Sequence, residues 1–174
     1  MLAARSAVGS VQRARQEAAI ASNVLAWLRV HPVRILGVYW PMRDEPDLRP
    51  LYAELAAKGM RLALPVVLEC DAPLVFAAWS PGDALAVDRM GISAPVSRTL
   101  LTPDALLVAC VGFSDTGHRL GYGGGFYDRT LARLPRPRTV GIATEAGRAP
   151  FAHDPHDIAM DVVITERMTP GTAS

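Results

Sequence analysis

The chain has little of what marks several large classes of protein. It has only two cysteines, Cys70 and Cys110, each in or beside an apolar run. We expect both to be buried free thiols in a reducing compartment. No apolar stretch reaches the roughly 18 residues that a membrane-spanning helix needs, and no apolar leader pattern follows the first arginine, Arg5. These absences predict a cytoplasmic protein.

Strong charge of either sign is also missing. The formal net charge is +1, and no run of Lys and Arg exceeds two residues. Such a chain lacks the basic surface by which proteins bind nucleic acids or anionic membranes. We therefore expect no nucleic-acid or membrane partner. As separate expectations, the protein is a monomer and acts on a small molecule. A length of 174 residues, half of them hydrophobic, predicts one domain over 1–174.

Apolar residues recurring every three or four positions predict the helices. The first has its clearest pattern over 11–28 and is expected to cover about 6–30. A second is predicted over 48–58, with Gly59 as the residue that ends it. A third follows the glycine-rich stretch, over 126–134.

Short runs rich in apolar, β-branched and aromatic residues predict the strands, at 34–40, 61–67, 74–79, 106–111, 139–143 and 162–165. Residues 84–104, with Pro95 and Pro103, are expected to form a long loop, and 169–174 to fray. Strands that alternate with helices favour an α/β fold: a mostly parallel sheet with helices on both faces, in a single three-layer Rossmann-like domain. Ligands collect beyond the carboxyl ends of such strands, where the loops 41–47, 112–125 and 144–157 are expected.

The stretch 117–129, GHRLGYGGGFYDR, is the strongest signal of chemistry. It contains four glycines within five residues, which let backbone amides approach a ligand closely. A helix that begins just beyond adds unpaired N–H groups, so strand, loop and helix together favour a phosphate cradle. The alternative is a flexible turn that only ends one element and begins another. The stretch is not a Walker A motif, and Phe126 stands where the dinucleotide fingerprint has its third glycine.

Several polar residues near these loops have two interpretations. Asp128 could favour the helix dipole, or could hold Mg²⁺ beside a bound phosphate. Glu45 and Trp40 suit a flat polar heterocycle, although a loop glutamate is more often solvated and a strand-end tryptophan more often core.

Neither a metal centre of histidines nor a protein nucleophile is indicated. His153 and His156 flank Pro155 without a third set of ligands, so a transition-metal site is not favoured. Asp157 would support Mg²⁺ or cap a turn, and His118 is expected to be exposed. Since no Ser-His-Asp arrangement is evident, a phosphate cradle fits phosphoryl transfer, in which positioning and charge neutralisation do most of the work.

At these residues the chain resembles the 5-formyltetrahydrofolate cyclo-ligase family, over about 34–166. The core of the resemblance is GHRLGYGGGFYDRTL, supported in order by YWPMRDEPD, GMRLALPVV, FAAWSPGD, MGISAP and PHDIAMDVVITE. The resemblance implies an enzyme that uses ATP and Mg²⁺ to close 5-formyltetrahydrofolate, with or without a polyglutamate tail, to 5,10-methenyltetrahydrofolate, releasing ADP and phosphate. The formyl oxygen would attack the γ-phosphate, and N10 would then close on the activated carbon as phosphate leaves.

The resemblance also implies roles for individual residues. The ATP-binding residues would be Arg5, Arg119, Leu120, Gly121, Tyr122, Gly123, Gly124, Gly125, Phe126 and Tyr127. The folate-binding residues would be Trp40, Glu45, Tyr122, Gly123, Gly124, Gly125 and Phe126. Asp128 and Asp157 would bind the metal, and Arg119, Tyr127 and Asp128 would be catalytic, with Arg119 stabilising charge on the transferred phosphoryl group.

The chain departs from the family pattern at Ala94, Ala109 and Ser114, and its basic N-terminus is short. Arg5 is the best match to the family's N-terminal phosphate contacts, with Arg13 and Arg15 behind it. These departures support a second hypothesis, a ligase-like relative that binds folate or nucleotide without cyclising it. A third, a sugar-phosphate isomerase or acyltransferase on a related scaffold, has only fold analogy behind it.

Overall fold

The protein is described by a computed structural model over residues 8–88, 91–133 and 135–167. Its centre is a seven-stranded sheet in the order β11-β10-β7-β1-β2-β3-β6. The strands are β1 (Ile35–Gly37), β2 (Arg61–Val66), β3 (Val75–Trp79), β6 (Leu100–Leu101), β7 (Ala105–Ala109), β10 (Arg138–Ile142) and β11 (Val162–Ile164). Strands β11 through β2 run parallel, and β3 and β6 pair antiparallel. The mostly parallel sheet is confirmed, and β3 turns back because the connection from β2 holds no crossover helix.

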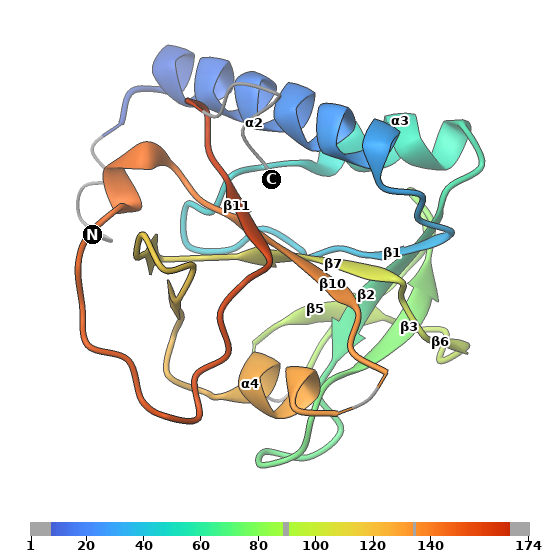
Figure 1. Ribbon diagram of the computed structural model, residues 1–174. Helices are drawn as coiled ribbons and strands as arrows, with labels where there is room; N and C mark the ends of the chain where they lie inside the picture. Colours follow the sequence, from blue (N-terminus) through green and yellow to red (C-terminus); the bar gives the residue numbers. More distant parts are fainter. Residues whose placement is uncertain (1–7, 89–90, 134, 168–174) are drawn as a thin grey trace.

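Helices cover both faces of this sheet, as predicted (Figure 1). The helices α2 (Ser10–Val30) and α3 (Arg49–Ala57) lie on one face, and α4 (Phe126–Leu131) lies on the other. Gly59 follows α3 with a left-handed φ of 88° and donates its N–H to the Ala56 carbonyl, which confirms it as the residue that ends the helix. The predicted helical positions 6–7 and the predicted frayed end, 169–174, lie outside the described residues.

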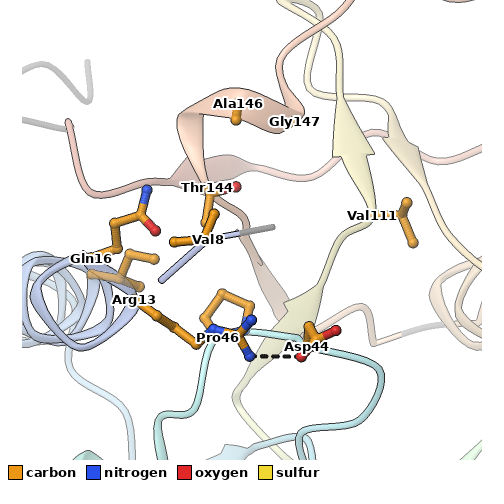
Figure 2. A pocket seen from close by; sticks show the side chains of 10 residues that line it. Val8, Arg13, Gln16, Asp44, Pro46, Val111, Thr144, Ala146 and Gly147 are labelled. Atoms are coloured by element: carbon orange, nitrogen blue, oxygen red, sulfur yellow. Dashed lines mark hydrogen bonds and ion pairs between the residues drawn. The ribbon is translucent and has the colours of Figure 1, made fainter. Parts of the chain in front are cut away.

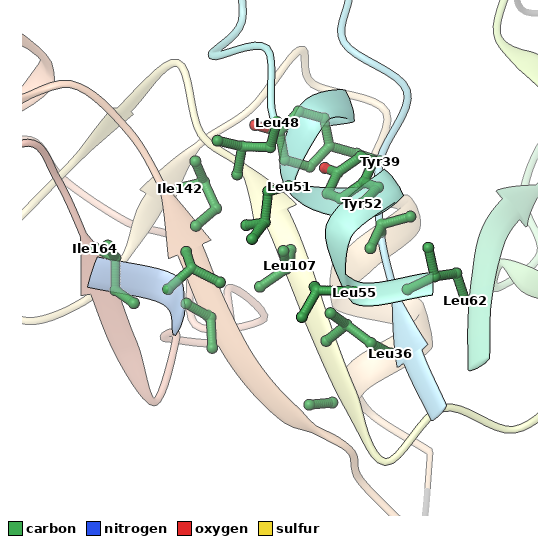
Figure 3. Close-up of a cluster of buried hydrophobic side chains, with 14 of the residues drawn as sticks. Leu36, Tyr39, Leu48, Leu51, Tyr52, Leu55, Leu62, Leu107, Ile142 and Ile164 are labelled. Carbon is green, nitrogen blue, oxygen red and sulfur yellow. The ribbon is translucent and has the colours of Figure 1, made fainter. Parts of the chain in front are cut away.

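The core forms where these layers meet. Figure 3 shows leucines of α3 packed over the sheet beside Leu36, Leu107 and Ile142. Strand β7 serves both faces, because Leu107 joins this cluster whereas Leu106 and Val108 join the cluster under α4. A strand buried on both faces has the continuous apolar run that the sequence shows. Each fully buried leucine contributes about 1.5–3 kcal/mol relative to an exposed one.

The predicted loops contain short strands that the sequence did not reveal. Residues 84–104 hold the hairpin of β4 (Leu85–Val87) and β5 (Ser93–Pro95) as well as β6. The glycine-rich stretch begins with a hairpin of β8 (Gly112–Phe113) and β9 (Arg119–Leu120), and the loop after β10 contains a 3₁₀ turn, η1 (Glu145–Gly147). Strands of two or three residues are too short to show the alternation of apolar and polar residues by which strands are predicted.

The two cysteines differ from each other. Both are free, and Cys110 is buried as predicted. Cys70 is exposed, so the prediction of a second buried thiol was wrong. It lies in the turn beyond the buried end of β2, where the apolar run has already ended. Within the described residues, no helix is both long enough and apolar enough to span a membrane.

Candidate functional site

The order of the parallel strands reverses direction between β1 and β7. From β1 the chain moves to β2 on one side, and from β7 it moves to β10 and β11 on the other. The loops beyond the carboxyl ends of β1 and β7 therefore diverge and leave a crevice, which is where open α/β sheets bind ligands. These two loops carry Glu45 and the glycine-rich stretch, the two strongest candidates in the sequence.

A cavity lies at this point of the fold (Figure 2). Its walls come from the α2 side, from the loops after β1 and β7, and from the loop after β10; they are Val8, Arg13, Gln16, Ile20, Asp44, Pro46, Val111, Thr144, Ala146 and Gly147. Arg13 and Asp44 form an ion pair across it, with Nη1 and Oδ1 2.6 Å apart. Residues 119–127 do not line this cavity, so the glycine-rich stretch flanks it instead of forming its wall.

Glu45 is fixed in a tight turn at the base of the loop after β1. Its side chain is only 7% exposed, so the solvated interpretation of this loop glutamate was wrong. The Glu45 Oε2 accepts the Met42 amide at 3.0 Å, and the Glu45 amide donates to the Met42 carbonyl at 3.0 Å. The backbone carbonyl of the next residue, Pro46, accepts a hydrogen bond from the Tyr39 hydroxyl at 2.6 Å. These bonds set the conformation of the whole loop.

Trp40 belongs to a chain of aromatic rings that runs from this loop into the core. Its ring meets Trp79 edge-on with centroids 5.8 Å apart, and Trp79 meets the buried Tyr52 at 6.4 Å. Arg49 lies over the Trp40 ring at 5.1 Å and is held there by Asp47 at 2.6 Å. The hydrogen bond from Arg49 lowers the pKa of the Asp47 carboxyl. Trp40 is thus half-buried, and serves both as core and as a wall beside the loop.

The glycine-rich stretch exposes backbone donors. Among the described residues, the amides of Gly123, Gly124 and Gly125 have no acceptor. Gly125 begins α4 in the left-handed region, with φ 63°. Arg129 anchors the stretch by donating from Nη2 to the Gly124 carbonyl at 2.7 Å and to the Cys70 carbonyl at 3.3 Å. Because α4 has only six residues, most donors for a bound anion come from the loop itself.

Arg119 and Asp128 form an ion pair, and both bind the backbone of Ile158, the residue after Asp157. The Arg119 Nη2 lies 2.8 Å from Asp128 Oδ2, and their side chains are 8% and 22% exposed. Arg119 Nη1 donates to the Ile158 carbonyl at 2.9 Å, and the Ile158 amide donates to Asp128 Oδ1 at 3.0 Å. In this arrangement the Arg119 guanidinium is engaged by protein groups, so its direct effect is to position Asp128.

Tyr127 lies between the Arg119–Asp128 pair and the loop after β1. The Arg119 guanidinium lies 5.8 Å from the centre of the Tyr127 ring. Burial, and then the negative charge of Glu45, raise the pKa of the Tyr127 phenol. The structure therefore brings Glu45 near Tyr127 and its neighbours Arg119 and Asp128, although Glu45 lies far from these three residues in the sequence.

Asp128 and Asp157 are the two carboxylates that could hold a cation, and each is engaged by protein groups. Asp157 caps a turn by accepting the Asp154 amide at 2.8 Å, and the residue after it is bonded to Asp128. In the described part of the chain no group of three or more His, Cys, Asp and Glu converges. Two carboxylates without a full cage suit Mg²⁺ that arrives with a phosphate ligand, since Mg²⁺ is usually held by one or two carboxylates plus substrate oxygens.

Two of the histidines stack on each other, and within the ranges that the structure describes they join no cluster of three or more metal-ligating residues. His118 is half-buried, and its ring stacks on His153 with centroids 3.7 Å apart and planes 2° apart. The expectation that His118 is exposed was therefore wrong, because the loop after β10 covers it. Arg5, the predicted N-terminal phosphate contact, lies outside the described residues.

Sequence analysis did not single out Asp44, Arg129 or Thr144, although each lies in a stretch that it placed near the site. Arg129 is the last residue of the glycine-rich stretch, and its anchoring bonds could have been suspected from that position. Asp44 and Thr144 line the cavity because α2 packs against the loops after β1 and β10, which no local pattern reveals.

Comparison with known proteins agrees with this geometry. The model of the 5-formyltetrahydrofolate cyclo-ligase family matches residues 1–166. The 5-formyltetrahydrofolate cyclo-ligase of Escherichia coli (strain K12) is 31% identical, over 77% of this chain and 73% of its own length. The enzyme of that name from Mycoplasma pneumoniae is 25% identical, over 95% of this chain and 94% of its own length. The solution structure of Aquifex aeolicus 5,10-methenyltetrahydrofolate synthetase is similar with a TM-score of 0.79 and 31% identity, covering 96% of this chain and 86% of that one. The chain therefore belongs to the 5-formyltetrahydrofolate cyclo-ligase family.

Proposed function

We propose that this protein is a 5-formyltetrahydrofolate cyclo-ligase that uses ATP and Mg²⁺ to form 5,10-methenyltetrahydrofolate, ADP and phosphate. Family membership and the names of its relatives support the cyclo-ligase activity. The observation that carries the proposal is the position of two loops, one with a buried glutamate and one with open glycine amides, on either side of the strand-order reversal.

The loop after β1 would bind the folate. Glu45 is a nearly buried carboxylate, which suits a hydrogen bond to a ring N–H. Trp40 would pack against the flat heterocycle. The folate would also contact the stretch from Tyr122 to Phe126 on the opposite side of the crevice.

The glycine-rich stretch would bind the ATP phosphates. Its open amides at Gly123, Gly124 and Gly125 are suited to phosphate oxygens. The rest of the predicted contacts, from Arg119 to Tyr127, would support this conformation, and Arg5 would reach the phosphates from the N-terminal segment. Asp128 and Asp157 would hold Mg²⁺, which when bound neutralises phosphate charge.

The proposed reaction depends on the positioning of the two substrates and uses no protein nucleophile. The formyl oxygen of the folate attacks the γ-phosphorus, the bond to ADP breaks, and an O-phosphorylated intermediate forms. N10 then attacks the activated carbon, the C–O bond to phosphate breaks, and the N10 proton is lost to the departing phosphate or to solvent. The protein would align the two substrates, exclude water from the intermediate and stabilise charge on the phosphoryl group. Arg119 would contribute by holding Asp128.

A turnover assay tests the proposal. Purified protein is mixed with 5-formyltetrahydrofolate, and methenyl-folate absorbance is followed with and without Mg-ATP. We expect product only when Mg-ATP is present. Ligand binding without product would instead support a ligase-like relative that does not cyclise, and protein that binds neither ligand would contradict both.

Other properties stay predictions that the same protein can test. We propose that the whole chain forms one domain, acts as a monomer in the cytoplasm and accepts folate with or without a polyglutamate tail. Gel filtration and comparison of mono- and polyglutamylated substrates would check the state of assembly and the tail preference.

A further inference from the structure

One arginine at the mouth of the crevice, Arg43, has no acidic partner in the part of the chain that the structure describes. Four other arginines near the site are engaged: Arg13 by Asp44, Arg49 by Asp47, Arg119 by Asp128, and Arg129 by backbone carbonyls. Arg43, in contrast, pairs with no carboxylate among the described residues, and it is exposed.

The backbone holds Arg43 in an unusual place. Residues 42–45 form a turn closed by the two bonds between Met42 and Glu45. Its central residues, Arg43 and Asp44, both have positive φ, at 49° and 60°. Glycine and asparagine are the usual residues in such a turn, and a side chain there costs conformational energy. The turn sends Asp44 back to Arg13 on α2 and leaves Arg43 pointing at the glycine-rich stretch.

The contact that Arg43 makes there is one that a ligand could replace. Its guanidinium lies 4.9 Å from the centre of the Tyr122 ring, and Tyr122 is 42% exposed. An exposed cation–π contact is weaker than charge-assisted hydrogen bonds from an arginine to an oxyanion. The pair therefore spans the two loops that flank the crevice while keeping the charge available.

We propose that Arg43 is a substrate-binding residue that takes an oxyanion, a phosphate or a carboxylate, at the mouth of the crevice. In the proposed cyclo-ligase reaction, on which this inference rests, the phosphate would belong to ATP and the carboxylate to the glutamate tail of the folate. Arg43 would leave the Tyr122 face and close on that group when the ligand enters.

The test compares the wild type with Arg43→Gly, Arg43→Lys and a control, Arg61→Gln. Arg61 is exposed at the amino-terminal end of β2, at the opposite end of the sheet. The dissociation constants are measured for Mg-ATP, for 5-formyltetrahydrofolate and for a formyl-tetrahydropteroate without the glutamate tail. All titrations are made well below the melting temperature of each variant. We expect Arg43→Gly to melt no lower than the wild type, because glycine tolerates the left-handed conformation.

Arg43→Gly is expected to weaken the binding of one anionic ligand about tenfold or more. Arg43→Lys should restore part of that lost affinity, and Arg61→Gln should leave all three dissociation constants unchanged. A loss for Mg-ATP identifies the phosphate. A loss for the folate, but not for the tailless analogue, identifies the tail carboxylate. If Arg43→Gly binds all three probes within twofold of the wild type, the inference is wrong while the proposed function stands. A wild type that binds neither Mg-ATP nor the folate would instead remove the proposed function.

Discussion

At the scale of single residues, Asp128 has a structural role in addition to the metal-binding role that we propose for it. The motif suggests a metal ligand, whereas the structure shows a carboxylate that also neutralises the nearly buried Arg119 and fixes the Ile158 amide. A residue with both roles should affect stability as well as turnover.

Asp128→Ala should therefore lower both activity and the free energy of unfolding. Breaking a buried ion pair from one side costs about 3–5 kcal/mol, and because Asp128 is partly solvated we expect about 2–3 kcal/mol. Urea unfolding measures this loss. Asp71→Ala is the control, since Asp71 is exposed and without an ion-pair partner in the described residues, and should stay within about 0.5 kcal/mol. An Asp128→Ala protein as stable as that control would show that the pair does not matter.

Tyr127 should remain protonated at every pH at which the enzyme works. Burial and the nearby Glu45 raise the pKa of its phenol above the usual value of about 10. A raised pKa in the folded state leaves stability unaffected at neutral pH and lowers it once pH exceeds the unfolded value. The pH profile of kcat between about pH 6 and 9 should therefore have the same shape in the wild type and in Tyr127→Phe. Loss of a basic limb in the variant would show that the phenol ionises during the reaction.

At the scale of elements, the glycine-rich stretch is not uniformly glycine-dependent. At Gly125 the left-handed φ of 63° would strain any side chain, and an added Cβ would come within 2.8 Å of Arg129 Nη1. At Gly121 an added Cβ would meet nothing within 4 Å. The requirement for glycine in the fold thus differs between two positions of one motif.

Gly125→Ala should destabilise the protein by more than about 1 kcal/mol, while Gly121→Ala should be neutral or slightly stabilising. Thermal unfolding of the two variants, which carry the same substitution four residues apart, measures the difference. Equal melting temperatures would mean that α4 and its first residue can rearrange freely.

At the scale of the whole molecule, one residue, Asp104, ties three central strands together at their amino-terminal ends through its carboxylate and its backbone carbonyl. Asp104 Oδ2 accepts the amides of Arg34 and Ile35 at 2.8 and 2.9 Å, and the Asp104 carbonyl accepts the Arg138 amide at 3.0 Å. The two amides lower the pKa of this carboxyl. Its side chain therefore fastens β1 beside β7, the two strands between which the strand order reverses.

Asp104→Ala should cost about 1–2 kcal/mol at neutral pH, because two backbone donors lose their acceptor. A depressed pKa gives stability that is present above the unfolded value of about 3.9 and is lost as pH falls through the folded value. The gap between wild type and variant should thus be constant from pH 6 to 8 and shrink below about pH 4. A gap that does not depend on pH would show that the ionised form has no special role.

Much of the fold could be predicted from the sequence because its long elements carry strong periodic patterns. The strands at 61–67, 106–111 and 139–143 and the helix at 48–58 are found within one or two residues of their predicted limits. The short hairpins and the reversal at β3 could not be predicted, since they depend on pairing with distant segments. The two loops of the site could be identified from residue types alone. The Arg43–Tyr122 contact could not, because it joins two loops that only the sheet brings together. The Arg119–Asp128 pair could not either, because its formation depends on how the glycine-rich stretch folds back on itself.

The most direct measurement of the central claim compares single-turnover formation of methenyl-folate by the wild type and by Glu45→Gln, each with Mg-ATP. Glutamine keeps the size of this buried side chain but removes its charge. If the crevice between β1 and β7 is the active site, the wild type will form product and the folded variant will lose at least about tenfold in rate or folate affinity. A wild type without product, or a Glu45→Gln enzyme as active as the wild type, would contradict the account.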